Sequence, residues 1–319
     1  MTAGSDRLCE QFGLEHPIFQ GGMGYVSTAK LAGAVSAAGG LGVIATGGTM
    51  EAEDLRRQIA EVRERAGERP FGVNVLLPNS AEDDEGFANR QLVRSEIDVC
   101  LQERVPVVVS GLGDPRQIID EVHAAGAKFV GVVGSLRAAR KVQAAGADAV
   151  VAQGSEAGGH VGQTATLPLA QAVLHKLGVP VLMAGGIATG EAVAAALALG
   201  ASGVSVGTRF LASDESDAHP AYKQAVVDAT ENHTIVTRAC TGKPSRALRN
   251  EFTLAWEGRD ADVAPGMQQA AENLWRARAG AVDGDIVQGF LPMGQGAAVI
   301  DEVLPAAEIV ARLATTSRV

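Results

Sequence analysis

The segment from Asp148 to Gly162 joins the pattern of a buried strand to side chains that can do acid–base chemistry. It opens with an apolar, partly β-branched run, which is typical of a strand buried on both faces of a parallel sheet. It then turns polar, with Gln153, Glu156 and His160 set among glycines. Parallel α/β enzymes place their chemistry at the carboxyl ends of strands, and an imidazole has an unperturbed pKa near neutrality. We therefore predict that His160 is a functional residue, and that Glu156 either orients it or caps a backbone amide.

Two later turns have the composition of a phosphate site. Gly185 and Gly186 follow one apolar run, and Gly207, Thr208 and Arg209 follow the next. In eight-stranded α/β barrels the loops after the last two strands commonly bind phosphate with backbone N–H groups and a helix N-terminus. We therefore predict that these glycines bind a phosphate group and do not serve only as tight turns.

The cofactor that this pattern favours is FMN. A dinucleotide fold has weak support, because no GxGxxG with a downstream acid follows the first apolar run, and the Gly-Leu-Gly segments at Gly40 and Gly111 are partial matches. An FMN lying across a barrel mouth would face the backbone of Gly21–Met23 and the side chains of Asn74 and Gln153. A non-redox barrel enzyme, such as an isomerase or aldolase acting on a sugar phosphate, stays open as an alternative.

Composition argues against several other classes of protein. No set of His, Cys and Asp has the spacing of a zinc site and no GxSxG is present, so we predict neither a catalytic metal nor a serine triad. The net charge of −10 disfavours nucleic acid and anionic membranes as partners, and no apolar run is long enough to cross a bilayer. Three scattered cysteines are typical of reduced thiols, so we expect a cytoplasmic protein.

A repeated pattern indicates the elements that position these groups. The segments beginning at His123, Gln143 and Ala198 each show a helix end, a glycine, polar residues and an apolar strand. Extending the pattern along the chain predicts eight strands, at Pro17–Gln20, Leu41–Ala45, Phe71–Leu76, Val105–Val109, Phe129–Val133, Ala149–Ala152, Val179–Ala184 and Gly203–Val206.

Eight such strands alternating with helices predict an α/β fold of the closed (β/α)₈ TIM-barrel type. A doubly wound open sheet is the alternative. After Phe210 the pattern changes, with helices expected at Asp214–Thr230 and Met267–Ala281. We expect residues 1–212 plus 296–319 to form the FMN-binding barrel, and residues 213–295 to form a mostly helical insertion, a lid subdomain, that covers the barrel mouth.

Five blocks of sequence resemble a known family. They begin at Pro17 (PIFQGGM), Phe71 (FGVNV), Ala152 (AQGSEAGGH), Ala184 (AGGI) and Val206 (VGTRF), in that order. Together they resemble the nitronate monooxygenases, formerly called 2-nitropropane dioxygenases, a family that also contains the FMN-dependent enoyl-ACP reductases of the second type. The resemblance covers nearly the whole chain, to the Gly-Gln-Gly at residues 294–296.

The resemblance implies an activity and a set of site residues. In nitronate oxidation the flavin takes electrons from a carbanion-like substrate and then reacts with dioxygen. His160 would be the catalytic histidine, acting as the base when a neutral nitroalkane must first lose its α-proton. The residues implied to contact FMN are Gly22, Met23, Asn74, Gln153, Gly185, Gly186, Gly207, Thr208 and Gln295.

The branch of the family is left open by the residues. The short segment Val161–Pro168 is more like the reductase branch, which implies the alternative of an FMN- and NAD(P)H-dependent reductase or dehydrogenase of enoyl or other acyl thioesters. Lys243, Arg246 and Arg249 form a basic cluster that would receive a phosphorylated carrier if it faced the mouth. Internal salt bridges or a solvated face would explain the cluster equally well. The expected partner is a small molecule, a nitronate or an acyl thioester, and a homodimer is left open.

Overall fold

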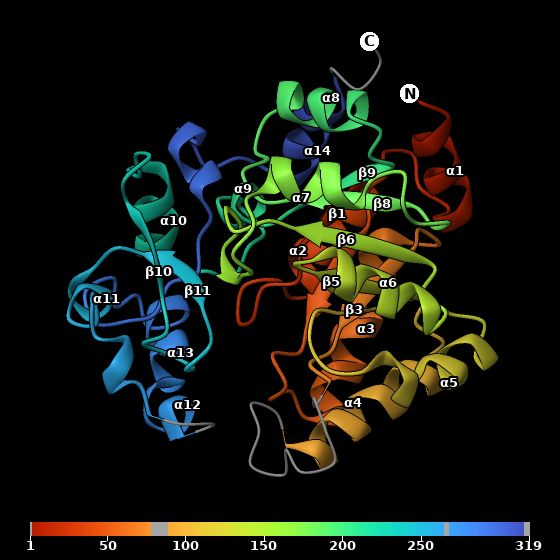
Figure 1. Cartoon of the computed structure of the whole chain (residues 1–319). Coiled ribbons are helices and arrows are strands. Elements are labelled where there is room, and N and C mark those ends of the chain that lie inside the picture. The colour runs from red at the N-terminus through yellow and green to blue at the C-terminus, as the bar shows by residue number, and fades with distance from the viewer. Residues whose placement is uncertain (1, 78–88, 265–267, 316–319) are drawn as a thin grey trace.

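Eight parallel strands form the centre of the computed structural model, which describes residues 2–77, 89–264 and 268–315. In chain order the strands are β1 (Ile18–Gln20), β2 (Gly42–Ala45), β3 (Phe71–Asn74), β4 (Val107–Ser110), β5 (Lys128–Val133), β6 (Ala149–Gln153), β8 (Val181–Ala184) and β9 (Gly203–Val206). They are hydrogen-bonded in the order β1-β9-β8-β6-β5-β4-β3-β2. Each predicted strand is therefore present, with ends shifted by no more than two residues (Figure 1).

The sheet closes on itself between its first and last members. Phe19 of β1 forms a parallel bridge with Leu41, directly before β2. The Gln20 amide donates to the Leu41 carbonyl at 2.8 Å, and the Leu41 amide donates to the Ile18 carbonyl at 2.9 Å. The predicted (β/α)₈ barrel is confirmed, and the open-sheet alternative is excluded.

The amino end of the barrel is plugged by a helix that the sequence did not predict. Helix α1 (Ala3–Phe12) buries Leu8 and Phe12 in the same apolar cluster as the inward-facing strand residues. Phe12 packs edge-on against Phe19 of β1, with ring centroids 5.5 Å apart. Because this end is filled, the carboxyl end is the one left to hold a ligand.

The remaining helices of the barrel cover the outside of the sheet (Figure 1). They are α2 (Ala29–Ala37), α3 (Ala52–Ala66), α4 (Arg90–Gln102), α5 (Ile119–Ala124), α6 (Leu136–Ala144), α7 (Thr166–Val173), α8 (Gly190–Ala198) and α14 (Ala306–Thr315). Helix α14 packs against α2 and α8, so the C-terminal segment completes the ring. Small residues permit close packing: a Cβ on Gly42 of β2 would lie 1.8 Å from the Ala32 carbonyl oxygen of α2.

The chain between β9 and α14 holds a short helix, α9 (Thr208–Leu211), and then the insertion. The insertion contains α10 (Pro220–Val227), β10 (Thr234–Thr237), β11 (Ser245–Leu248), α11 (Glu251–Leu254), α12 (Gln268–Asn273) and α13 (Trp275–Ala281). The helix expected at 214–230 is shorter because it begins at Pro220, where the His219 side chain caps it. The helix expected at 267–281 is divided at Leu274, and Met267 lies outside the described residues.

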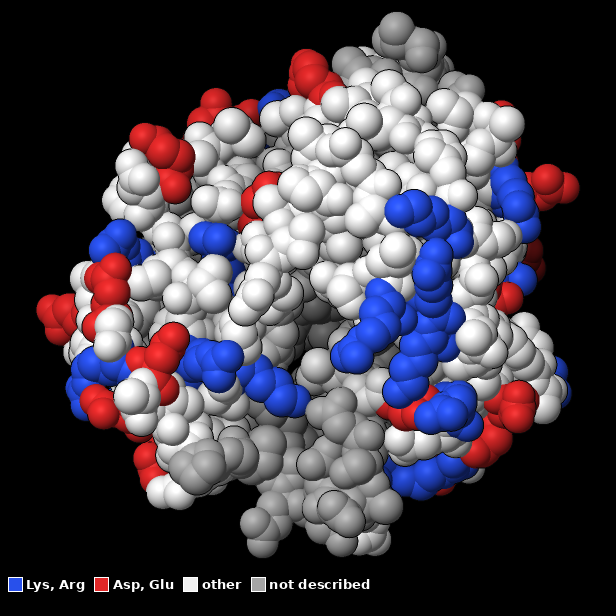
Figure 2. Space-filling view, in the orientation of Figure 1, with Lys and Arg blue, Asp and Glu red and all other residues white. Residues whose placement is uncertain are grey.

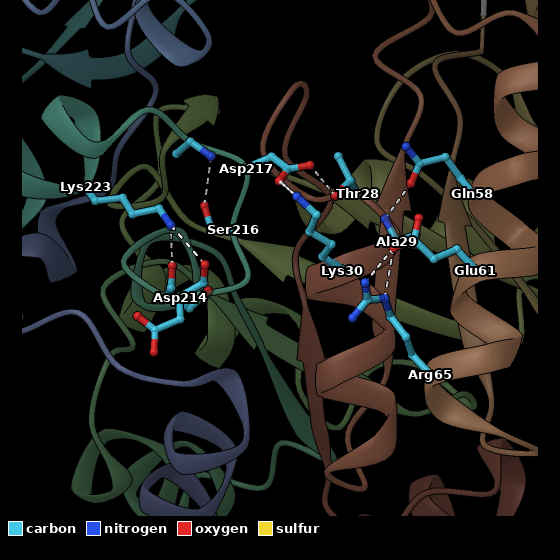
Figure 3. Close-up of polar contacts among 12 residues, drawn as sticks. Thr28, Ala29, Lys30, Gln58, Glu61, Arg65, Asp214, Ser216, Asp217 and Lys223 are labelled. Carbon is cyan, nitrogen blue, oxygen red and sulfur yellow. Dashed lines mark hydrogen bonds and ion pairs between the residues drawn. The ribbon is translucent and has the colours of Figure 1, made fainter.

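A small sheet joins the insertion to the barrel, and this sheet was not predicted. Strand β7 (Gly159–His160), in the loop after β6, pairs antiparallel with β11, and β11 pairs with β10. A second junction lies at the start of α2, where Asp217 accepts a hydrogen bond from Thr28 at 2.7 Å and forms an ion pair with Lys30 at 3.0 Å (Figure 3). The Asp217 amide also donates to the Val26 carbonyl at 3.1 Å. The insertion is thus tied to the barrel at separate points.

Candidate active site

A cavity of about 880 Å³ lies at the carboxyl end of the barrel. Its walls include residues that follow β1, β2, β3, β6, β8 and β9, together with insertion residues such as Lys243 and Leu274. The space-filling view shows a hollow between the barrel and the insertion, with Lys and Arg side chains on both sides of it (Figure 2). The volume lies within the range of small-molecule and cofactor sites.

Most of the residues that the sequence singled out line this cavity. The lining includes His160, Lys243, Gly22, Met23, Asn74, Gln153, Gly185, Gly186, Gly207 and Thr208. They come from strands that are far apart in the sequence and meet because the carboxyl ends of parallel strands share one rim of the barrel.

Several of the singled-out residues occupy other positions. Among the described residues that line the cavity, Glu156, Arg246 and Gln295 do not appear. Glu156 accepts a hydrogen bond from the amide of Thr166 at 3.3 Å, at the first residue of α7, so its carboxylate caps that helix. Gln295 is exposed, and its backbone amide donates to the backbone carbonyl of Glu156 at 2.9 Å. Its two neighbours, Gly294 and Gly296, line the cavity.

The basic cluster is divided by the structure. Arg246 donates from Nε to the Ser155 carbonyl at 2.7 Å and from Nη1 to the hydroxyl of Thr234 at 2.9 Å. Arg249 forms an exposed ion pair with Glu257 at 3.0 Å. Lys243 is the member of the cluster that lines the cavity. Its ammonium therefore supplies positive charge at the mouth.

The turns after β8 and β9 present backbone to the cavity. Gly185 and Gly186 both have left-handed backbone, with φ of 106° and 71°. Helix α9 begins directly after Gly207 and has no side chain bonded to its first amides. The hydroxyl of Thr208 accepts a hydrogen bond from the Gly294 amide at 2.9 Å. Uncapped N–H groups at the start of a helix are suited to an anionic group such as phosphate.

The opposite wall of the cavity is close-packed around Asn74. A Cβ on Gly22 would lie 2.7 Å from the Cβ of Asn74, so only glycine allows the turn after β1 to approach the end of β3 this closely. The carbonyl of Asn74 lies 3.2 Å from both the amide and the hydroxyl of Thr46. The hydroxyl of Thr46 also lies 2.8 Å from the carboxyl of Glu96, which is fully buried on α4. A buried acid thus supports this side of the cavity.

His160 is held by both the barrel and the insertion. The side-chain amide of Gln153, the last residue of β6, donates to the His160 carbonyl at 2.6 Å. Strand β11 pairs with the His160 backbone, and the hydroxyl of Thr241 lies 3.0 Å from Nε2 of the imidazole. Burial, followed by the nearby Lys243 ammonium, lowers the pKa of His160 to about 4. The imidazole is therefore neutral at neutral pH and able to accept a proton.

Sequence reasoning missed several residues of this site. Thr241, Thr46 and Glu96 act through hydrogen bonds between segments far apart in the chain, and no local pattern marks Thr46 or Glu96. Tyr25 lines the cavity with a positive φ of 62°, which is rare for a side chain of its size. The one available signal was for Thr241, because it stands two residues before Lys243.

Neither a metal centre nor a membrane helix is visible in the part of the chain that the structure describes. Within residues 2–77, 89–264 and 268–315, no three His, Cys, Asp or Glu side chains are grouped so as to hold a metal ion. No helix in those ranges combines the length and the apolar character needed to cross a bilayer.

Comparison with known proteins gives a consistent result. The family model for nitronate monooxygenase matches residues 5–316. A probable nitronate monooxygenase of Staphylococcus aureus is 32% identical, over 88% of this chain and 89% of that protein. The (3aS,4S,5R,7aS)-5-hydroxy-7a-methyl-1-oxo-octahydro-1H-indene-4-carboxyl-CoA dehydrogenase of Mycobacterium tuberculosis is 33% identical, over 95% of this chain and 93% of that protein.

Two solved structures are also similar to this chain. FabK from Thermotoga maritima superposes with a TM-score of 0.87 at 42% identity, covering 98% of this chain and 96% of that one. A nitroalkane oxidase from Streptomyces ansochromogenes superposes with a TM-score of 0.83 at 34% identity, covering 96% of each chain.

Proposed function

This chain belongs to the nitronate monooxygenase family, a family of oxidoreductases, and from that premise we propose that it is an FMN-dependent enzyme that oxidises alkyl nitronates with dioxygen. The observation that carries the proposal is the pairing of a neutral imidazole, His160, with a cation, Lys243, in one cavity at the carboxyl end of the barrel. In this proposal residues 1–212 and 296–319 form the FMN-binding barrel, and residues 213–295 cover its mouth.

The residues of the cavity fit an FMN. Its volume of about 880 Å³ is sufficient for a flavin and a small substrate. A Cβ on Gly207 would meet only the Met23 sulfur, at 3.7 Å, so open space lies beside the uncapped start of α9. Gly185, Gly186, Gly207 and Thr208 would hold the phosphate, and Gly22, Met23, Asn74 and Gln153 would face the ring, with Gln295 at the edge. When bound, FMN supplies the electron acceptor for the substrate.

The protein groups supply charge and proton transfer. A nitronate is an anion, so the Lys243 ammonium attracts it into the cavity and lowers the cost of removing it from water. A neutral nitroalkane must lose its α-proton first, and the neutral imidazole of His160 is in the protonation state that accepts it. Once the proton has moved, the anion formed stabilises the imidazolium beside it. This ion pair makes the proton transfer more favourable than the pKa of His160 in the free enzyme alone would allow.

A second function has support from the comparisons. The similarity to FabK and to the indene-carboxyl-CoA dehydrogenase favours an FMN- and NAD(P)H-dependent reductase or dehydrogenase of enoyl or other acyl thioesters. The same two residues serve this chemistry, because an enolate is also an anion and His160 would donate or accept its proton. Only Lys243 of the basic cluster lines the cavity, so Arg246 and Arg249 give this reading no added support.

Parallel stopped-flow experiments separate the two functions. The purified protein is mixed without oxygen with NADH, with NADPH or with propionate 3-nitronate, and flavin absorbance is recorded. The proposal expects rapid bleaching by the nitronate alone and return of the colour when dioxygen is added. Bleaching by a nicotinamide, with turnover accelerated by an enoyl thioester, would replace it with the second function. A colourless protein that does not bind added FMN would contradict both and revive a sugar-phosphate isomerase or aldolase.

A further inference from the structure

We propose that the insertion provides a binding surface for an alkyl chain inside this cavity, and that Ala277 limits the length of chain that fits. The surface, here called the apolar face, consists of Leu274, directly before α13, and of Ala277 and Ala281 within α13. The proposal deepens the proposed function and rests on it in placing the reacting carbon of the substrate beside His160. It assigns the substrate to nitronates whose alkyl chain is longer than a few carbons.

Helical spacing puts the three side chains on one side of α13. Leu274 has α-helical backbone, with φ of −62° and ψ of −29°, so the helical spacing extends back to it. Positions i, i+3 and i+7 share a helix face, and all three side chains line the cavity. At 1.5 Å per residue the apolar face is about 10 Å long. It is therefore longer than a nitroalkane of two or three carbons requires.

Packing places one end of the apolar face beside the segment that contacts His160. The thiol of Cys240 donates to the backbone carbonyl of Asn273 at 3.6 Å, directly before Leu274. The first two residues of the apolar face also pack against the buried cluster that contains Cys240. The next residue, Thr241, has its hydroxyl 3.0 Å from Nε2 of His160. A chain whose reacting carbon lies at the imidazole therefore has the apolar face within its reach.

The other end of the apolar face reaches the loop after β1. Ala281 is 3% exposed and belongs to one buried cluster with Val26 of that loop. Tyr25, the neighbour of Val26, lines the cavity and has a left-handed φ of 62°. Strained backbone at a residue other than glycine is characteristic of functional sites. The apolar face thus extends along the cavity from the segment at His160 to the barrel.

The chemistry of the apolar face suits a hydrocarbon. Each methylene that moves from water onto an apolar surface increases affinity about fourfold. Ala277 is half-buried and lies in the middle of the apolar face, where its small side chain leaves space. A larger side chain at this position would occupy the space of the terminal carbons of a long chain. Ala277 is therefore the residue that sets the length.

The first test measures binding without turnover. Straight-chain carboxylates from propionate to octanoate serve as unreactive planar anions, and their Kd values are measured by isothermal titration calorimetry on the FMN-loaded protein. In the wild type Kd should fall about fourfold for each of the first added methylenes. Ala277→Leu should lower the affinity for octanoate relative to that for propionate by about tenfold or more, and Ala277→Val should have an intermediate effect.

A matched control and a second test use the same variants. Ala271→Leu makes the same substitution at an exposed position of α12, and it should keep the wild-type ratio of the two affinities. With preformed nitronates from nitroethane to nitrohexane, kcat/KM in the wild type should rise about fourfold per methylene. Ala277→Leu should remove most of this rise.

The outcomes separate this proposal from the proposed function. Affinities that do not depend on chain length, or equal ratios in Ala277→Leu and Ala271→Leu, would overturn the proposal. Weaker FMN binding in Ala277→Leu with an unchanged chain-length dependence would also overturn it, because the apolar face would then contact the cofactor. The expected affinities in a protein that oxidises no nitronate would leave the apolar face in place and contradict the proposed function instead.

Discussion

The hydroxyl of Thr46 and the carboxyl of Glu96 lie 2.8 Å apart in a position from which water is excluded, with the two residues 3% and 0% exposed. The same hydroxyl lies 3.2 Å from the Asn74 carbonyl. The Thr46 hydroxyl can donate to only one of these two oxygens at a time, and the Thr46 amide donates to the same Asn74 carbonyl at 3.2 Å. Burial raises the pKa of Glu96 from 4.5 to about 7, against the opposing effect of the hydrogen bonds that its carboxyl receives from Thr46 and from the Met50 amide.

Glu96 should make the protein less stable as the pH rises from about 4.5 to about 7. In that window the folded chain retains a proton that the unfolded chain has released, so the free energy of unfolding falls with pH, by on the order of 3 kcal/mol at most. Glu96→Gln, whose side-chain amide can still accept from Thr46 but does not titrate, should flatten this slope in urea unfolding at a series of pH values. Gln in place of the exposed Glu64 is the control, and an unchanged slope in Glu96→Gln would contradict the raised pKa.

His160 should have the opposite effect on the pH dependence of stability. Its pKa is lowered from 6.5 to about 4, so between these values the unfolded chain binds a proton that the folded chain does not. Stability is therefore lost as the pH falls through this window, and His160→Asn should reduce that loss. The variant should also retain FMN and lose turnover of nitroalkanes by about 10²- to 10⁴-fold. Wild-type rates in His160→Asn would refute the role of the imidazole, and His175→Asn on the surface should change neither property.

Lys243 should control both the binding of anions and the basicity of His160. Removing its charge in Lys243→Gln should raise KM for a nitronate about tenfold, since one cation at a partly exposed site contributes on the order of 1 kcal/mol. Because the ammonium lowers the pKa of His160, the acid limb of kcat/KM for a nitroalkane should move to higher pH in the variant. Arg249→Gln removes a charge of the same cluster that is paired with Glu257, and it should leave both measurements unchanged.

Gly186 should be required for binding the phosphate of FMN. Gly186→Ala places a Cβ at a residue with φ of 71°, and that atom would lie 2.7 Å from the carboxylate of Glu156. Gly126→Ala is the matched control, because its φ is 77° and no atom lies within 4 Å of the added Cβ. Both variants should lose about 1–2 kcal/mol of stability from left-handed backbone. Only Gly186→Ala should weaken FMN binding tenfold or more, and equal affinities in a titration of the apoprotein would exclude the assignment.

The barrel could be predicted because each of its strands has a local sequence pattern. Apolar runs such as Gly203–Val206, each ended by glycine, are the signature of strands buried on both faces, and here the predicted and observed bounds coincide. Helix α1 was missed for the converse reason. Its segment is polar. Its two large apolar residues, Leu8 and Phe12, are buried because they plug the barrel, and no local sequence pattern indicates that tertiary contact.

The residues of the site also fall into those that the sequence could predict and those that it could not. Residues at strand ends, such as Asn74 and Gln153, were predictable because the topology brings those ends together. The partners of His160 and Asn74 were not predictable, because Thr241 and Thr46 reach them through pairings that depend on the complete fold. Charge alone left open whether Arg246 faces the mouth or makes internal contacts, and its register in β11 directs the guanidinium to the Ser155 carbonyl.

Strand β7 belongs to the barrel by sequence and to the insertion by its hydrogen bonds. The two parts are consequently not interchangeable modules. A chimera that receives residues 213–295 from a relative also receives a new neighbour for the imidazole, so reactivity and substrate range are inherited together. Grafting experiments across this family should move the boundary to keep Gly159 and His160 with the segment that pairs with them.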